Sequence, residues 1–155
     1  MSSPEHDSRR HPAVTVTVGE WSEEIDIQIA PLIREMWIAG IDTLMSCQEV
    51  SPGIAWIDFP DVQELLRFLD LVTWYEDGID TFYNRVTGQR VGFMSTPPWE
   101  YQFHLLDIFE DREAPMDGMG RFDASVSVYF PIPDIAELTA RLQARNAEGA
   151  FPETK

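Results

Sequence analysis

The chain of 155 residues carries 27 acidic side chains against 11 basic ones, a formal net charge of −16. A surface of this sign repels phosphate backbones and anionic lipids, so we expect no direct binding of nucleic acid or of a membrane surface. The same charge favours encounter with a basic protein partner. The presence of one cysteine excludes an internal disulfide and the structural zinc patterns built on paired cysteines.

Length and apolar content predict a single domain. The 44% of hydrophobic residues suffices for a core, which we place over residues 13–146, between polar tails at 1–12 and 147–155 that we expect to be mobile. No segment approaches the ~20 consecutive apolar residues of a membrane span, and no apolar run follows the polar N-terminus. We therefore expect a soluble, cytoplasmic protein.

The first elements are predicted to be a hairpin and a helix. Valine and threonine alternate at 14–18, as in a strand, and isoleucines of one parity at 25–29 predict a second strand. In an alternative interpretation Asp26 is the N-cap of a helix that starts there. Either way, an apolar stripe predicts a helix over 31–39 that stops at Gly40, because glycine readily adopts the left-handed conformation of a helix end.

Two further strands and a helix follow. Extended runs at 42–49 and 53–59 flank a Val-Ser-Pro-Gly sequence that suits a tight turn between antiparallel strands. At 61–72 the apolar period changes from two to about 3.6, which indicates a helix. Asp61 and Glu64 have the spacing of a capping box at its start.

A short helix is predicted next, over 78–87, with Asp77 as its N-cap and Gly88 at its end. Residues 89–98 lack periodicity and are predicted to be a loop.

The second half of the chain repeats the order strand, strand, helix. Residues 99–109 are strand-like, 110–120 are predicted to be a polar loop, and 122–130 alternate strictly between apolar and polar. The last helix is predicted to start at Asp134, which again has capping-box spacing to Glu137.

Two matching sequences suggest two similar halves. IDFPDVQELLRFL and VYFPIPDIAELTARL both place Phe-Pro between a strand and an Asp-x-x-Glu-Leu helix start, although such starts are common enough to match by chance. Each strand and each helix has one apolar side to bury. We therefore predict an α+β domain with a mainly antiparallel sheet of four to six strands and helices packed chiefly on one face, with two ββα halves as one arrangement. The predicted core residues are Val62, Leu65, Leu66, Leu69, Val126, Val128, Ile135, Leu138 and Leu142.

Cys47 is the first candidate for chemistry. A nucleophilic cysteine needs its thiolate stabilised by a histidine or another cation, whereas Glu49 nearby would oppose ionisation. His6 and His11 fall in the expected tail, which leaves His104 as the candidate base. The simpler interpretation, which we favour, is that Cys47 is a small buried side chain in a structural strand and turn.

No pattern indicates a metal or a cofactor, and we predict neither. The acidic residues are dispersed, and 110–118 lacks the regular alternation of ligands in a calcium loop. Aromatic residues gather in the centre of the chain, where most should fill the core. On a sheet left open on one side, some would form a concave site, and the candidates for it are Trp99, Tyr101 and Tyr129.

The sequence MWIAGIDTLMSCQ, at 36–48, is similar to the LWxxGIxTxxSCQ stretch of a group of small bacterial and phage proteins. SVSVYFP, before the last helix, resembles their SVRFP ending. The chain departs from the group at Met36, where leucine is usual, and at Tyr129, where arginine is usual. The resemblance implies no particular activity, but it makes four positions the first to test: Thr43, Ser46, Cys47 and Gln48.

These observations favour a soluble, acidic, non-catalytic module that binds a basic protein partner or a small ligand through an aromatic sheet face with an acidic rim. The absence of a recognisable catalytic set supports this expectation. The alternative is a small thiol-dependent enzyme that uses Cys47 and His104.

Overall fold

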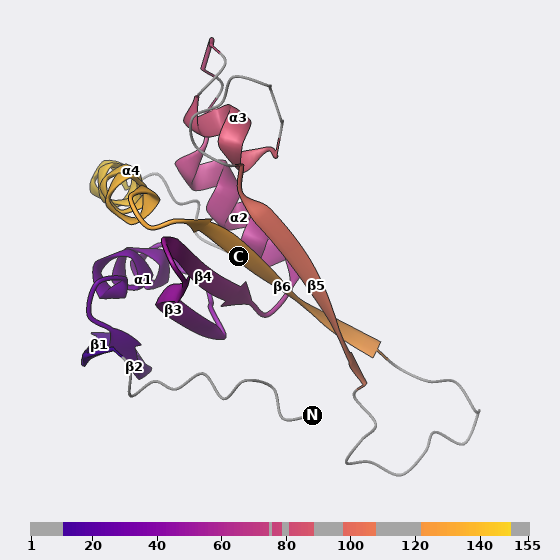
Figure 1. Cartoon of the computed structure of the whole chain (residues 1–155). Coiled ribbons are helices and arrows are strands. Elements are labelled where there is room, and N and C mark those ends of the chain that lie inside the picture. The colour runs from indigo at the N-terminus through magenta and orange to yellow at the C-terminus, as the bar shows by residue number, and fades with distance from the viewer. Residues whose placement is uncertain (1–10, 75, 79–80, 89–97, 108–121, 150–155) are drawn as a thin grey trace.

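The chain adopts the predicted α+β fold. A two-stranded sheet and a four-stranded antiparallel sheet combine with helices, as Figure 1 shows. No helix in the described part of the chain has both the length and the hydropathy of a membrane span. The computed structural model describes residues 11–74, 76–78, 81–88, 98–107 and 122–149.

Some of the predicted segments lie outside the described residues. The loop predicted at 110–120 is one of them, and so is nearly all of the loop predicted at 89–98. The same holds for residues 1–10 and 150–155 of the two predicted tails.

The N-terminal hairpin is tighter than predicted. β1 (Ala13–Val18) and β2 (Trp21–Asp26) are antiparallel, with Val18 paired to Trp21. The two-residue turn begins at Gly19, whose φ of +58° is the positive value required at the first loop residue of a type II′ turn.

Neither interpretation of residues 25–29 holds over its whole length. The strand ends at Asp26, and α1 (Ala30–Ile38) begins after Ile29, its N-cap. Asp26 caps no helix, since its carboxylate accepts a hydrogen bond from the neighbouring strand. Gly40 follows the end of α1 with a φ of +76°, as predicted.

The next two strands and their turn are confirmed, although the first strand spans 45–51 rather than 42–49. β3 (Met45–Ser51) and β4 (Ile54–Phe59) pair antiparallel, and Gly53 in the Pro-Gly turn has a φ of +78°. A type II turn requires a positive φ at this position, which explains the Pro-Gly pair.

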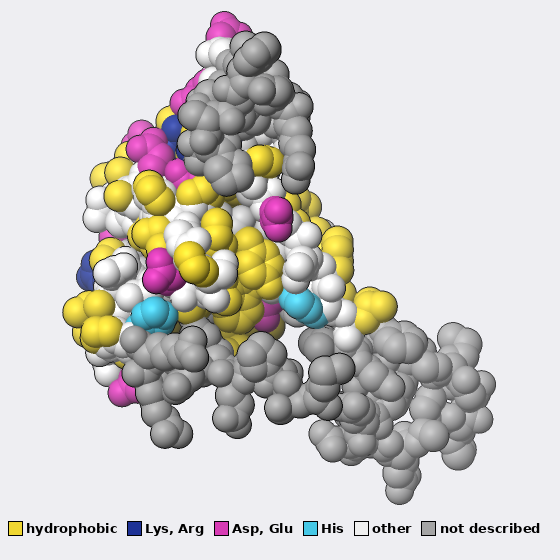
Figure 2. Space-filling view, in the orientation of Figure 1, with side chains coloured by type: hydrophobic (Ala, Val, Ile, Leu, Met, Phe, Trp, Pro, Cys, Tyr) yellow, Lys and Arg dark blue, Asp and Glu magenta, His cyan; other side chains and the backbone are white. Residues whose placement is uncertain are grey.

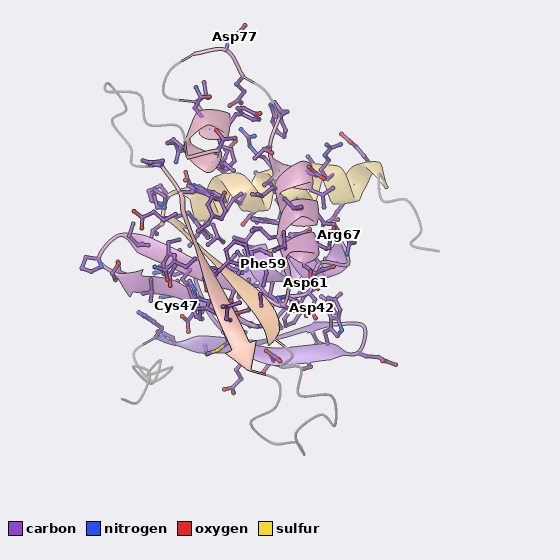
Figure 3. The ribbon with its side chains drawn as sticks, turned by 90° about the vertical axis from the view of Figure 1, so that its right-hand side faces the viewer. Asp42, Cys47, Phe59, Asp61, Arg67 and Asp77 are labelled. Atoms are coloured by element: carbon purple, nitrogen blue, oxygen red, sulfur yellow. The ribbon has the colours of Figure 1, made fainter. Side chains whose placement is uncertain are left out.

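The capping box at the start of α2 (Val62–Val72) is only half formed. Asp61 Oδ1 accepts a hydrogen bond from the backbone N–H of Glu64 at 2.9 Å. The Glu64 carboxylate does not return to Asp61. It accepts from the backbone N–H of Asp42 at 2.7 Å and from Arg67 at 2.8 Å, so it ties α2 to the segment before β3 (Figure 3).

The short helix α3 (Phe82–Val86) has a different cap from the predicted one. Thr81 Oγ1 accepts from the backbone N–H of Asn84 at 3.1 Å, so the assignment of Asp77 was wrong. Figure 3 shows Asp77 in the loop at the far end of the molecule. Threonine directly before the first turn accepts one of the free backbone N–H groups, whereas Asp77 lies too far back along the chain. Gly88 follows the helix end with a positive φ, as predicted.

The second half forms two strands and a helix: β5 (Glu100–Asp107), β6 (Phe122–Pro131) and α4 (Asp134–Glu148). The capping box predicted at Asp134 is wrong. The N-cap is Pro133, whose side chain has no hydrogen-bond acceptor, and the Asp134 carboxylate pairs with an arginine from α3.

The C-terminal boundary also differs from the prediction. Residues 147 and 148 belong to α4, which ends at Gly149 with a φ of +62°, so the tail was predicted to start too early.

The four-stranded sheet has the order β3-β4-β6-β5, with every neighbouring pair antiparallel. Each ββα half therefore contributes one outer and one central strand. α2 and α4 contact the sheet and each other, while α1 packs against α4 and the β1–β2 hairpin (Figure 1). The described helices leave the opposite side of β4 and β6 without helical cover.

Most of the predicted core residues are buried, but Leu66 is not. Its side chain is 47% exposed. The buried stripe of α2 consists of Leu65, Phe68 and Val72, and Leu66 is rotated by about 100° around the helix axis from Leu65, away from this stripe. Val62 and Leu69 are partly buried at the edge of this stripe. The other predicted core residues are buried, namely Leu65, Val126, Val128, Ile135, Leu138 and Leu142.

Candidate functional site

The side of the sheet away from α2 and α4 carries a row of polar groups. In β4, Ile57 and Phe59 are buried against the helices, so Asp58 between them faces the other way. Strand pairing places Asp58 opposite Ser127 of β6, and Ser127 opposite Gln102 of β5. Three neighbouring strands therefore meet in one line of hydrogen-bonding side chains.

A hydrogen-bond chain joins Asp58, Ser127 and His104 along this row. Ser127 Oγ donates to Asp58 Oδ1 at 3.2 Å and lies 2.9 Å from His104 Nε2. Because the hydroxyl has only one proton, which it gives to Asp58, His104 must donate from Nε2. Burial raises the pKa of Asp58, although the Ser127 hydroxyl and His104 oppose the shift. The His104 side chain is thus held by a hydrogen bond to Ser127 on the neighbouring strand β6.

Of the three predicted binding aromatics, only Tyr129 lies on this face. Its hydroxyl donates to Gln102 Oε1 at 3.2 Å, and burial raises its pKa, with a further contribution from Asp58. Trp99 is buried on the helix side, where it packs between Phe82 and Phe130.

Tyr101 is also on the helix side of the sheet, since it pairs with the buried Val128. Its hydroxyl donates to the Val86 carbonyl at 2.8 Å, and burial raises its pKa. The structure therefore does not bring Trp99, Tyr101 and Tyr129 together on one surface.

Cys47 lies at the other edge of the sheet from His104, because β3 and β5 are the two outer strands. The two histidines in the described part of the chain are well apart in Figure 2. Cys47 has His11 and Asp26 beside it: one potential ligand atom from each side chain lies within 4.8 Å of the others. The structure thus brings together Cys47 and His11, and not Cys47 and His104.

The environment of Cys47 keeps its thiol protonated at neutral pH. The side chain is 1% exposed, and its burial is the main reason that its pKa rises to about 11. The carboxylates of Asp26 and Glu49 add to the rise, while a backbone hydrogen bond at Glu49 reduces it. A thiol in this state is a poor nucleophile.

The polar neighbours of Cys47 make structural contacts. Gln48 is buried, its Oε1 accepts from the backbone N–H of Gln28 at 2.7 Å, and its own N–H donates to Asp26 Oδ2 at 3.1 Å. Thr43 Oγ1 accepts from Trp37 Nε1 at 3.1 Å. The polar candidates thus hold β2, α1 and β3 together.

Ser46 is the remaining polar candidate. It pairs with the buried Ile57 and is half-buried, whereas Cys47 pairs with Trp56 on the other side of the sheet. Thr43, Ser46 and Gln48 therefore do not converge on one binding surface.

An exposed apolar feature appears on β5. Phe103 and Leu105 are 66% and 75% exposed, although they pair with Val126 and Ala124 on the helix side of the sheet. In Figure 1 β5 and β6 run on beyond the helices as a two-stranded arm. Among the described strands β5 pairs only with β6, so no described strand pairs with its other edge.

No family model matches the chain, and no solved structure matches it. It is similar to an uncharacterized protein of Acanthamoeba polyphaga mimivirus, with 34% identity over 90 residues. This stretch covers 54% of the chain and 44% of the viral protein, so the chain spans less than half of that relative's length.

Sequence patterns did not indicate two of the residues that surround Cys47. The sequence places His11 in a tail expected to be mobile, and Asp26 either within a strand or at a helix N-cap. Each comes from a different segment, so no local spacing links them. Only the packing of the β1–β2 hairpin on the edge of β3 brings them together.

Proposed function

We propose that this protein is a non-catalytic binding module that takes an extended, basic segment of a protein partner along the open edge of β5. The observation that supports it is the exposure of Phe103 and Leu105 on an edge strand. An open edge offers backbone N–H and C=O groups to an added strand, and alternate side chains supply specificity. Two large apolar side chains this exposed are typical of interaction sites.

The charge of the chain supports a basic segment. With a formal net charge of −16, the surface attracts cations over a distance of about 10 Å at 0.1 M salt. Opposite charge speeds the encounter, while the apolar contacts and the strand pairing would hold the complex. Salt should therefore slow association more than it speeds dissociation.

The alternative, a thiol-dependent enzyme, has less support. Cys47 is buried with a raised pKa, and His104 is hydrogen-bonded to Ser127 near the opposite edge of the sheet. A nucleophile and its base need to lie within hydrogen-bonding reach of each other.

The test is capture from a cell lysate at low and at high salt, followed by mass spectrometry of the bound proteins. The wild type is compared with the double variant Phe103→Ser, Leu105→Ser. Ile38→Ser, which removes an exposed apolar side chain from α1, is the matched control. We expect a basic partner that the wild type and the control retain and the double variant loses.

Hydrogen exchange on the complex then locates the contact. Binding should slow exchange of the amides of β5 and leave those of β3 unchanged. Equal capture by the double variant, or protection confined to another element, would show that the β5 edge is not the binding site.

A further inference from the structure

Three side chains with different metal-binding atoms converge beneath the β1–β2 hairpin. His11 precedes β1, Asp26 ends β2, and Cys47 lies on β3. They offer an imidazole nitrogen, a carboxylate oxygen and a sulfur, all within 4.8 Å of one another. We propose that His11, Asp26 and Cys47 form a zinc site that fastens the hairpin to the edge of the four-stranded sheet.

The surroundings of Asp26 point to a cation. This side chain is only 5% exposed, and no lysine or arginine of the described residues forms an ion pair with it. One of its oxygens accepts the backbone N–H of Gln48. Burial of a carboxylate beside a thiol is costly unless a positive charge compensates it. A divalent ion would supply that charge and bind the thiol as thiolate.

The mixture of donor atoms favours zinc over other common ions. Calcium and magnesium select oxygen ligands, whereas zinc accepts sulfur, nitrogen and oxygen together. Three protein ligands leave one tetrahedral position for water or for a further ligand.

The geometry requires only a small adjustment. Ligands of tetrahedral zinc lie about 3.5 Å apart, as its bond lengths dictate. The present atoms, within 4.8 Å of one another, need to approach by about 1 Å, which side-chain rotation can provide.

The second contact of His11 suits a metal ligand. Its Nε2 lies 3.3 Å from the carbonyl oxygen of Glu49. A neutral imidazole that donates from Nε2 has its lone pair on Nδ1, and metal-bound histidines commonly donate their other N–H to a backbone carbonyl in this way.

The test uses the full chain, stripped of metal with a chelator and titrated with Zn²⁺ alone or with Co²⁺ as a spectroscopic probe. We expect one equivalent of tightly bound metal and a thiolate-to-cobalt absorption band. His11→Gln should weaken zinc binding by about tenfold or more, and Cys47→Ala should abolish the sulfur band.

Two controls keep the experiment decisive. His104→Gln changes the histidine outside the cluster and should bind zinc as the wild type does. His11 is half-buried near the start of the described chain, so its replacement tests the site even where Cys47→Ala fails to fold. Zinc binding that is equal in His11→Gln and the wild type, or a cobalt spectrum without a sulfur band, would overturn the proposal and indicate binding to surface carboxylates.

Discussion

Arg85 and Asp134, 49 residues apart in the chain, form a bidentate ion pair between α3 and the start of α4. Nη2 of Arg85 lies 3.0 Å from Oδ1 of Asp134, and Nη1 donates to Oδ2. Trp99 Nε1 donates to the same carboxylate at 2.9 Å. Both charged side chains are largely buried, so the loss of one would leave the other without compensation.

Asp134→Ala should therefore lower the free energy of unfolding by roughly 3–5 kcal/mol, the range for a broken buried pair. Urea denaturation would measure it, with Asp77→Ala, an exposed loop position, as the control within about 0.5 kcal/mol of the wild type. Adding Arg85→Met to Asp134→Ala should restore part of the loss. A loss in Asp134→Ala no larger than the control's would contradict a stabilising role for the pair.

Cys47→Ala should lower the free energy of unfolding by ~1 kcal/mol at neutral pH in the presence of a chelator. The pKa of the folded thiol is about 11, above its ordinary value of 9.0, so the unfolded chain loses this proton first as the pH rises. The advantage of the wild type over the variant is complete below pH 9.0 and should shrink as the pH approaches 11. Urea denaturation of both proteins at neutral pH and at about pH 10 would measure this.

Alkylation provides an independent measurement on Cys47. The thiol should react slowly in the folded, metal-free protein because it is buried and protonated. Fast alkylation that His104→Ala abolishes would instead support the thiol-enzyme alternative.

Asp58→Asn should gain stability relative to the wild type as the pH rises from about 4 to 7. Burial raises the pKa of Asp58 above its ordinary value of 3.8, so ionisation costs the folded state, and this cost appears as the pH passes through the folded pKa. Asparagine keeps an acceptor for Ser127 without the charge. Asp70→Asn, on the exposed side of α2, corrects for the lower net charge. A difference between Asp58→Asn and this control that does not change with pH would refute the expectation.

Asp61→Ala should cost about 1 kcal/mol through loss of the α2 cap. Asp61→Asn removes the charge but keeps an oxygen that accepts the Glu64 N–H, so it should retain most of the stability. Thermal unfolding of the three proteins would compare them, and an equal loss in both variants would mean that charge, rather than the cap, matters.

Much of the fold was predictable because local rules act within single elements. The Pro-Gly turn, the end of α1 at Gly40 and the Asp61 cap each depend on a few adjacent residues. The ββα order followed from the change of apolar period. The alternation along β6 also identified Val126 and Val128 as core residues.

The errors arose where distant residues compete with local ones. Asp134 has the spacing of a capping box, but a bidentate bond to Arg85 satisfies its carboxylate instead. Phe103 and Leu105 share the parity of core residues, yet they are exposed on an arm that runs beyond the helices. Alternation gives the side of a sheet on which a residue lies, but not whether another element covers it.

The same limit applies to the candidate sites. The sequence marks Cys47 as a residue to test, but pairs it with His104 because His11 lies outside the expected domain. Strand order decides between these two histidines, and it depends on pairing between the two halves of the chain. No pattern within either half contains that information.

The central position of β4 and β6 also bears on how fast the protein folds. Phe59 pairs with Val126 and Ile54 with Pro131, so the pairs that join the two halves span 67 to 77 residues of chain. Closing such long loops costs conformational entropy before the strand pairing can stabilise the structure. This cost lowers the folding rate. We expect the first half to hold β4 as an unprotected edge until β6 arrives, so that newly made chains are most prone to aggregate during this interval.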